Sequence, residues 1–89
     1  MPAVSVSSST STEIVPVDYT RTLVVLTNTD ASANCYINFG AAATSGEAYI
    51  GPGGNMTISA GDSRCRCAIN GLSSSGTITI NYSKLSVGG

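Results

Sequence analysis

Short apolar segments separated by turn-forming residues run through most of this chain, and none of them has helical periodicity. The strongest, residues 21–27, is rich in β-branched residues and nearly apolar on both faces, which is typical of a central strand. In residues 35–39, Cys35, Ile37 and Phe39 alternate with more polar residues, the period-two pattern of a half-buried strand. We therefore predict an all-β protein, a single small antiparallel β-sandwich or jelly-roll-like barrel.

Four further segments are predicted to be strands, at residues 47–50, 56–59, 63–69 and 77–84. In the third of these, alternation places Cys65 and Cys67 on the inward face and Arg64 and Arg66 on the outward face. Turns are expected between the strands. Residues 51–54 suit a type II turn, because Pro52 presets φ at the first central position and Gly53 supplies a positive φ at the second. Asn70-Gly71 is also a strong turn signal.

The chain of 89 residues is expected to form one domain. Residues 1–17 are predicted to be an extended N-terminal arm, because residues 5–12 are almost entirely Ser and Thr and Pro16 disfavours a central strand. Residues 18–85 are predicted to be the β-sandwich domain, and residues 86–89 a C-terminal tail.

Charge and composition exclude several classes of function. Charged residues make up 10%, the net charge is −1 and histidine is absent. Nucleic-acid binding by phosphate neutralisation needs clustered cations, so no nucleic-acid partner is expected. Catalytic Ser-His or Cys-His pairs and zinc sites that contain histidine are excluded. The five acidic residues lie singly in the sequence, so we predict no catalytic residue, no cofactor site and no metal site, and a protein that is not an enzyme.

No apolar run reaches the length of a membrane span, and the first residues lack the pattern of a secretory signal. No membrane partner is therefore expected, and the protein is expected to be made in a cytoplasm.

A recurring order of motifs gives a resemblance to a known class. The motifs are Arg21-Thr22-Leu23-Val24-Val25-Leu26-Thr27-Asn28, Tyr36-Ile37-Asn38-Phe39-Gly40, Gly51-Pro52-Gly53, Cys67-Ala68-Ile69 and Gly76-Thr77-Ile78-Thr79-Ile80. Over about residues 20–84 the chain resembles small β-sandwich structural proteins of tailed bacteriophages, including capsid decoration (cement) proteins. The resemblance implies a virion protein, made in the host cytoplasm, that binds the major capsid protein or other virion proteins. We add the expectation of a homo-oligomer, because the core of so short a chain is small.

Two sets of residues are candidates for partner binding. The arm would lay apolar side chains along a sheet edge or groove of the partner; these are Val4, Val6, Ile14, Val15 and Val17. The alternative is a tail without a binding role. Arg64 and Arg66 would contact an acidic partner surface, because the planar fork of arginine suits carboxylates. The alternative for them is a solvated polar face.

The three cysteines allow three interpretations. Cys35 and Cys65, or Cys35 and Cys67, are candidates for a disulfide. The favoured alternative is that all three are buried thiols acting as small apolar residues. A metal site would need ligands from more than one chain, because three cysteines without histidine fall short of the usual four ligands.

Two other functions are compatible with the same fold. The chain could be a phage tail or head-fibre component. It could also be a receptor- or carbohydrate-binding module, with a site formed by Tyr36, Tyr49 and the loops at residues 41–46 and 72–76. Tyr19 and Tyr82 would complete such an aromatic face, although tyrosines in separate segments are more often core and rim residues.

Overall fold

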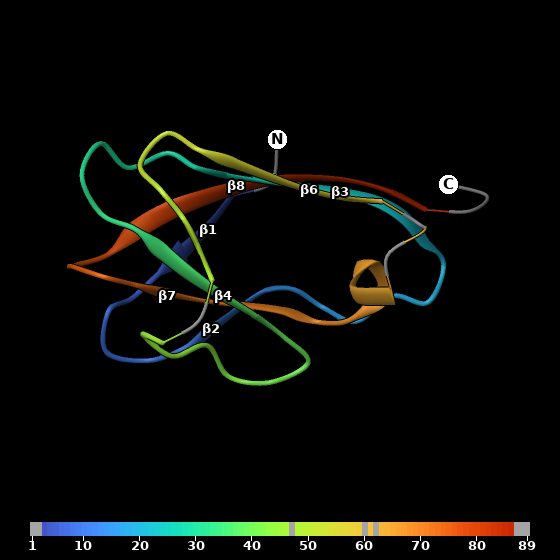
Figure 1. Ribbon diagram of the computed structural model, residues 1–89, viewed down its shortest axis with the longest axis horizontal. Coiled ribbons are helices and arrows are strands. Elements are labelled where there is room, and N and C mark those ends of the chain that lie inside the picture. The colour runs from blue at the N-terminus through green and yellow to red at the C-terminus, as the bar shows by residue number, and fades with distance from the viewer. Residues whose placement is uncertain (1–2, 47, 60, 62, 87–89) are drawn as a thin grey trace.

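The computed structural model describes residues 3–46, 48–59, 61 and 63–86 of the chain. These residues form two four-stranded antiparallel sheets packed face to face, and the predicted β-sandwich is confirmed (Figure 1). The first sheet has the order β1-β8-β3-β6. It contains β1 (Ala3–Val6), β8 (Ile78–Ser86), β3 (Arg21–Asn28) and β6 (Asn55–Ser59). As predicted, β3 is an interior strand.

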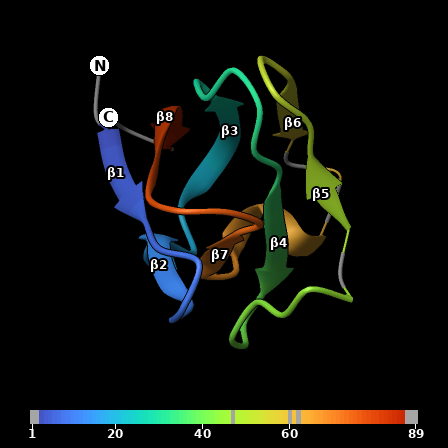
Figure 2. The same cartoon turned by 90° about the vertical axis from the view of Figure 1, so that its left-hand side faces the viewer.

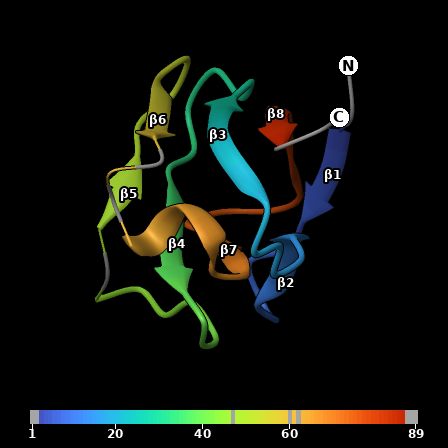
Figure 3. The ribbon, with the colours of Figure 1, turned by 90° about the vertical axis from the view of Figure 1, so that its right-hand side faces the viewer.

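The second sheet has the order β2-β7-β4-β5. It contains β2 (Thr12–Val15), β7 (Ile69–Ser73), β4 (Cys35–Phe39) and β5 (Tyr49–Ile50). The two layers face each other when the molecule is seen from its end (Figure 2). At the opposite end a single 3-10 turn, η1 (Ser63–Arg66), lies across the opening between the sheets (Figure 3).

The core fills the space between the sheets and follows from strand alternation. The predicted inward residues Cys35 and Ile37 of β4 and Ile78 and Ile80 of β8 are all buried. The predicted type II turn is also present: Gly54 N donates to the carbonyl of Gly51 at 2.9 Å, and Gly53 has φ of 71°. Burial of each of these isoleucines stabilises the fold by roughly 1.5–3 kcal/mol.

Residues 3–15 belong to the sandwich, so the prediction of an arm separate from the domain is wrong for them. Strand β1 pairs with β8, and β2 pairs with β7. A bulge in β2 turns both Ile14 and Val15 inward, where they are buried together with Val6. The serines and threonines between Val6 and Ile14 suit an exposed connection between two strands. Their abundance therefore does not indicate an arm outside the domain. Pro16 follows β2, an edge strand, as its missing N–H requires.

Two other local predictions are wrong. Residues 63–66 form the 3-10 turn η1 in place of a strand, and β7 begins only at Ile69. Asn70-Gly71 lies inside β7 and is not a turn. Glycine is required there by close packing: a Cβ on Gly71 would lie 2.6 Å from Ile14 Cδ1. Ser86 is the last residue of β8, while residues 87–89 of the predicted tail and Glu47 of the predicted strand lie outside the described residues.

Candidate functional site

The η1 end of the sandwich brings together part of the predicted partner-binding set. Val17 lies in the connection between β2 and β3, and Arg64 and Arg66 lie on η1. Asp18 N donates to the carbonyl of Arg66 at 3.0 Å, which ties the two segments together. Val17 is 51% exposed and both arginines are exposed. These three predicted residues therefore belong to one surface.

The other predicted residues do not reach this surface. Val6, Ile14 and Val15 are buried in the core, and Val4 is half-buried against it. Burial between the sheets removes Val6, Ile14 and Val15 from contact with a partner. The correction follows directly from the pairing of β1 and β2 with the body of the protein.

Arg21 connects the segments that form the η1 end. Its side chain is 0% exposed and donates to three carbonyl oxygens: Nε to Cys65 at 2.6 Å, Nη1 to Pro16 at 3.0 Å and Nη2 to Cys67 at 2.6 Å. A buried guanidinium needs such partners, because an unsatisfied charge is costly to remove from water. One side chain thus holds η1 and the end of β2 in place.

A bulge explains why Arg21 points inward. The pairing of β3 with β8 shifts between Arg21 and Leu23, so that Arg21 and Val24 both face the core although they are three residues apart. Simple alternation places Arg21 on the opposite face from Val24. The inward orientation of Arg21 could therefore not be predicted, because no signal in the strand pattern reveals the bulge.

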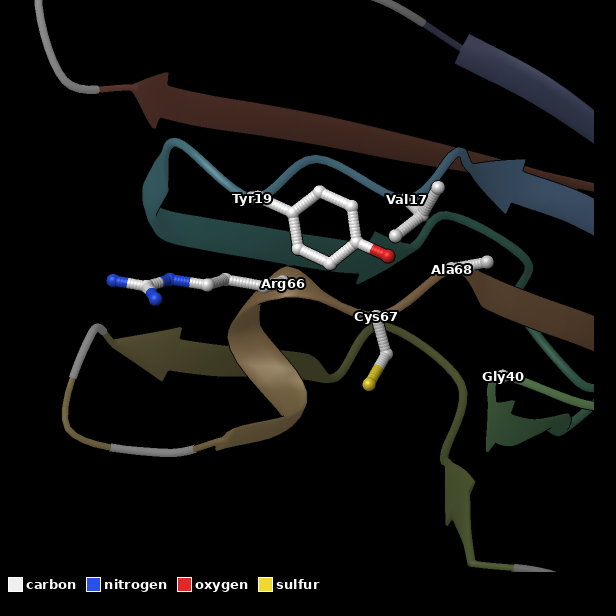
Figure 4. A pocket seen from close by; sticks show the side chains of 6 residues that line it. All are labelled: Val17, Tyr19, Gly40, Arg66, Cys67 and Ala68. Carbon is white, nitrogen blue, oxygen red and sulfur yellow. The ribbon is translucent and has the colours of Figure 1, made fainter.

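An open pocket of about 460 Å³ lies on this end of the molecule (Figure 4). It is lined by Val17, Tyr19, Gly40, Arg66, Cys67 and Ala68. Gly40 adopts φ of 77°, a conformation that favours glycine, at the end of β4. Tyr19 is 77% exposed, and the Cys67 side chain is half-buried. The lining is mostly apolar, which suits an aliphatic or aromatic side chain of a partner.

The rim of this end carries the exposed Arg64 and Arg66, together with Asp18 between the pocket residues Val17 and Tyr19. The Arg64 guanidinium carbon lies 5.0 Å from the centre of the Phe39 ring, a cation–π arrangement that fixes the position of η1 against β4. The Arg66 side chain is exposed and extends away from Cys67 (Figure 4). An apolar pocket lined in part by the exposed Arg66 is suited to a protein surface that combines apolar and acidic groups.

The outer face of the second sheet brings together Tyr36 and Tyr49 of the alternative carbohydrate site, whereas Tyr19 lines the pocket at the η1 end and Tyr82 lies on β8 of the other sheet. Tyr36 pairs with Tyr49 and with Leu72, and the two tyrosine rings meet edge to face with centres 6.0 Å apart. Two neighbouring amides are already engaged: Asn38 Nδ2 donates to the carbonyl of Ala42, and Asn70 donates to that of Ala41. These amide donors hold the first two residues of the loop, Ala41 and Ala42, in place.

The cysteines do not form the disulfides considered above. Cys35 and Cys65 are free, buried thiols. Burial raises the pKa of Cys35 to about 11, so this thiol is neutral near pH 7. The Cys65 Sγ lies 3.6 Å from the carbonyl oxygen of Arg21 and 3.7 Å from that of Ile58, as expected for a weak S–H donor in the core.

The described acidic residues are spread over the molecule. Glu13 lies on β2, Asp18 in the following connection and Asp30 in the connection after β3. Over residues 3–46, 48–59, 61 and 63–86, no three cysteine, aspartate or glutamate side chains gather to form a metal site. Within the same residues, no helix has the length and apolar character needed to cross a membrane.

Comparison with known proteins adds no identification. The chain matches no protein-family model, no curated protein and no solved structure at a significant level.

Proposed function

We propose that this chain is a non-enzymatic structural protein of a phage-like virion, a decoration protein that binds the outer capsid surface and stabilises contacts between capsid subunits. The class comes from the sequence resemblance described above. The observation that carries the proposed mode of binding is the η1 end, where the pocket lined by Val17 and Tyr19 lies beside the exposed Arg66. In this proposal a side chain of the capsid protein enters the pocket, and acidic groups around it meet the arginines.

The mechanism is binding linkage. A protein that binds the assembled lattice and not the separated subunits stabilises the lattice by mass action. A rigid body serves this role well, because little conformational entropy is lost when it binds. The three hydrogen bonds of Arg21 give the η1 end that rigidity. The body itself makes the contact, since β1 and β2 are part of the sandwich.

Quantitative mass spectrometry of purified particles tests the class. The copy number of this chain relative to the major capsid protein is expected to be one, or a simple fraction of one. A handful of copies per particle would place the protein on the tail or a fibre, and its absence from particles would reject the virion proposal.

Two exposed tyrosines provide a matched test of the binding surface. Tyr19 lines the pocket and is 77% exposed, whereas Tyr49 lies on the second sheet and is 57% exposed. Tyr19→Ser is expected to weaken attachment to particles stripped of this protein at least tenfold, and Tyr49→Ser is expected to leave it unchanged. Equal attachment of both variants and wild type would contradict a contact at the η1 end.

A carbohydrate-binding module is the second candidate, and the Tyr36–Tyr49 pair favours it. It ranks lower because the Asn38 and Asn70 amide donors are bound to backbone carbonyls. In a glycan array this alternative predicts binding that Tyr49→Ser abolishes and Tyr19→Ser does not.

A further inference from the structure

The outer face of the β1-β8-β3-β6 sheet carries no charged residue at the strand positions that the structure describes. The register defines this face: Val24 is buried, so the neighbouring positions Leu23 and Val25 of β3 point outward, together with their partners on β8 and β6. The outward partners are Leu85 and Ser83 on β8 and Thr57 on β6. The remaining outward positions are alanine, serine, threonine or asparagine.

The centre of this outer face is aliphatic. Leu23 lies directly opposite Leu85 in the pairing of β3 with β8, and Val25 is the next outward residue along β3. Leu85 is 56% exposed. A single exposed leucine needs no explanation, but an aliphatic strip surrounded by uncharged polar side chains has the composition of an interface centre, from which charges are depleted.

We propose that a second copy of this chain covers this outer face, giving a two-fold symmetric dimer in which the two β1-β8-β3-β6 sheets pack against each other. A two-fold contact brings the same surface of both copies together, so a charge near the symmetry axis would meet the same charge on the other copy. The outer face has no charged residue at its described strand positions, so no such repulsion arises. The η1 end differs, because it carries the exposed charges of Arg64 and Arg66. Glu13 lies on β2, at the edge of the other sheet.

The size of the face fits a weak, reversible dimer. A strand residue covers about 16 Å² of sheet, from a rise of ~3.4 Å and a strand spacing of ~4.8 Å. The four strands therefore offer roughly 400 Å² per copy in projection, and projecting side chains increase the accessible area. Two copies approach the ~1,000 Å² that separates specific interfaces from incidental contacts. We expect association in the micromolar range, and the dimer does not depend on the proposed virion role.

Analytical ultracentrifugation tests the dimer over a range of about 1 to 200 μM. Wild type is expected to shift from monomer to dimer within this range. Ser83→Lys places a charge at the centre of the face, at an exposed position, and is expected to weaken association at least tenfold. Leu85→Ser removes aliphatic surface without adding charge, and is expected to weaken association by a smaller factor.

Ser8→Lys is the matched control, because it adds the same charge at an exposed position in the connection between β1 and β2. It is expected to associate like wild type. Far-UV circular dichroism and thermal melting of each variant verify the fold. A wild-type protein that stays monomeric at 200 μM would overturn the proposal. A Ser83→Lys variant that is folded and dimerises as strongly as wild type would overturn it equally.

Discussion

Arg21 and Cys65 make two reciprocal contacts, in each of which the side chain of one residue meets the backbone carbonyl of the other. Arg21 Nε donates to the Cys65 carbonyl at 2.6 Å, and Cys65 Sγ lies 3.6 Å from the Arg21 carbonyl oxygen. One residue begins the central strand β3 and the other lies in η1, 44 residues later in the chain. The pair therefore fixes the end of the molecule that carries the pocket, and it couples the stability of the fold to the shape of the site.

We predict that Arg21→Met lowers the free energy of unfolding by about 3 kcal/mol, because it leaves carbonyl oxygens in and near the core without a donor. Arg21→Lys should recover only part of this loss, since an ammonium group lacks the planar fork that reaches three carbonyls. Urea denaturation measures both. Lys84→Met serves as the control, because Lys84 is exposed and its replacement should change stability by less than about 0.5 kcal/mol. An unchanged urea midpoint for Arg21→Met would show that the guanidinium is dispensable.

Gly71 is predicted to tolerate no side chain. A Cβ at this position would lie 2.6 Å from Ile14 Cδ1 and 3.1 Å from Cys35 Sγ, and both neighbours are buried. Gly71→Ala is expected to destabilise the protein by about 1–3 kcal/mol, the usual range for overpacking. Adding Ile14→Val removes the nearer atom, so the double variant should lose less stability than the sum of the two single changes.

Gly46→Ala is the matched control for that experiment. Apart from Gly46 itself and its two chain neighbours, no atom lies within 4 Å of a Cβ built at Gly46, so this variant should unfold at nearly the wild-type urea concentration. If Gly71→Ala behaved like Gly46→Ala, the close packing between β7, Ile14 and Cys35 would not be a constraint on the fold.

Side-chain alternation explains how much of this fold could be predicted. It identified the all-β class and the inward faces of β4 and β8, because regular strands reveal their buried side every second residue. It failed wherever the backbone departs from that regularity. The bulges at Arg21–Leu23 and Glu13–Val15 change which residues face the core, and nothing in a local pattern places them.

The candidate site was only partly predictable for a related reason. Val17, Arg64 and Arg66 were predicted as contact residues, and the structure brings them to one end. Arg21 and Gly40 were missed, since their roles depend on contacts between segments far apart in the sequence. Gly71 was interpreted as a turn residue because local sequence cannot show that Ile14 packs against it.

The Cys35 thiol is predicted to make the stability of the fold fall as the pH rises through the alkaline range. Burial raises its pKa in the folded protein to about 11, above the ordinary value of 9.0. The contribution of neutral Cys35 to the free energy of unfolding is therefore fully present below pH 9. It is lost as the pH rises from 9 to 11, because over this range the Cys35 thiol ionises in the unfolded chain before it ionises in the folded protein. Wild type should lose stability more steeply than Cys35→Ala over this range, as measured by urea midpoints at each pH. The comparison cancels any pH effect that the two proteins share. Parallel curves would contradict a neutral, buried Cys35.

Asp30 is predicted to make the stability of the fold depend on acidic pH, because its carboxylate binds backbone amides in the connection after β3. Its Oδ2 accepts hydrogen bonds from Ser32 N at 3.0 Å and Ala33 N at 2.7 Å, and these bonds lower its pKa below the ordinary 3.8. The same connection is tied to the core, because the buried Asn28 donates to the Ala33 carbonyl at 2.8 Å.

Because the pKa of Asp30 is lowered in the folded protein, its ionised carboxylate stabilises the fold above pH 3.8. This stabilisation is lost as the pH falls through the pKa of folded Asp30. Asp30→Asn should therefore melt at a lower temperature than wild type at pH 7, with the difference shrinking as the pH falls below 3.8. Glu13→Gln, which neutralises an exposed carboxylate on β2, should leave the melting temperature nearly unchanged. A constant difference between Asp30→Asn and wild type from pH 7 to pH 2 would show that the charge of Asp30 does not act through these backbone amides.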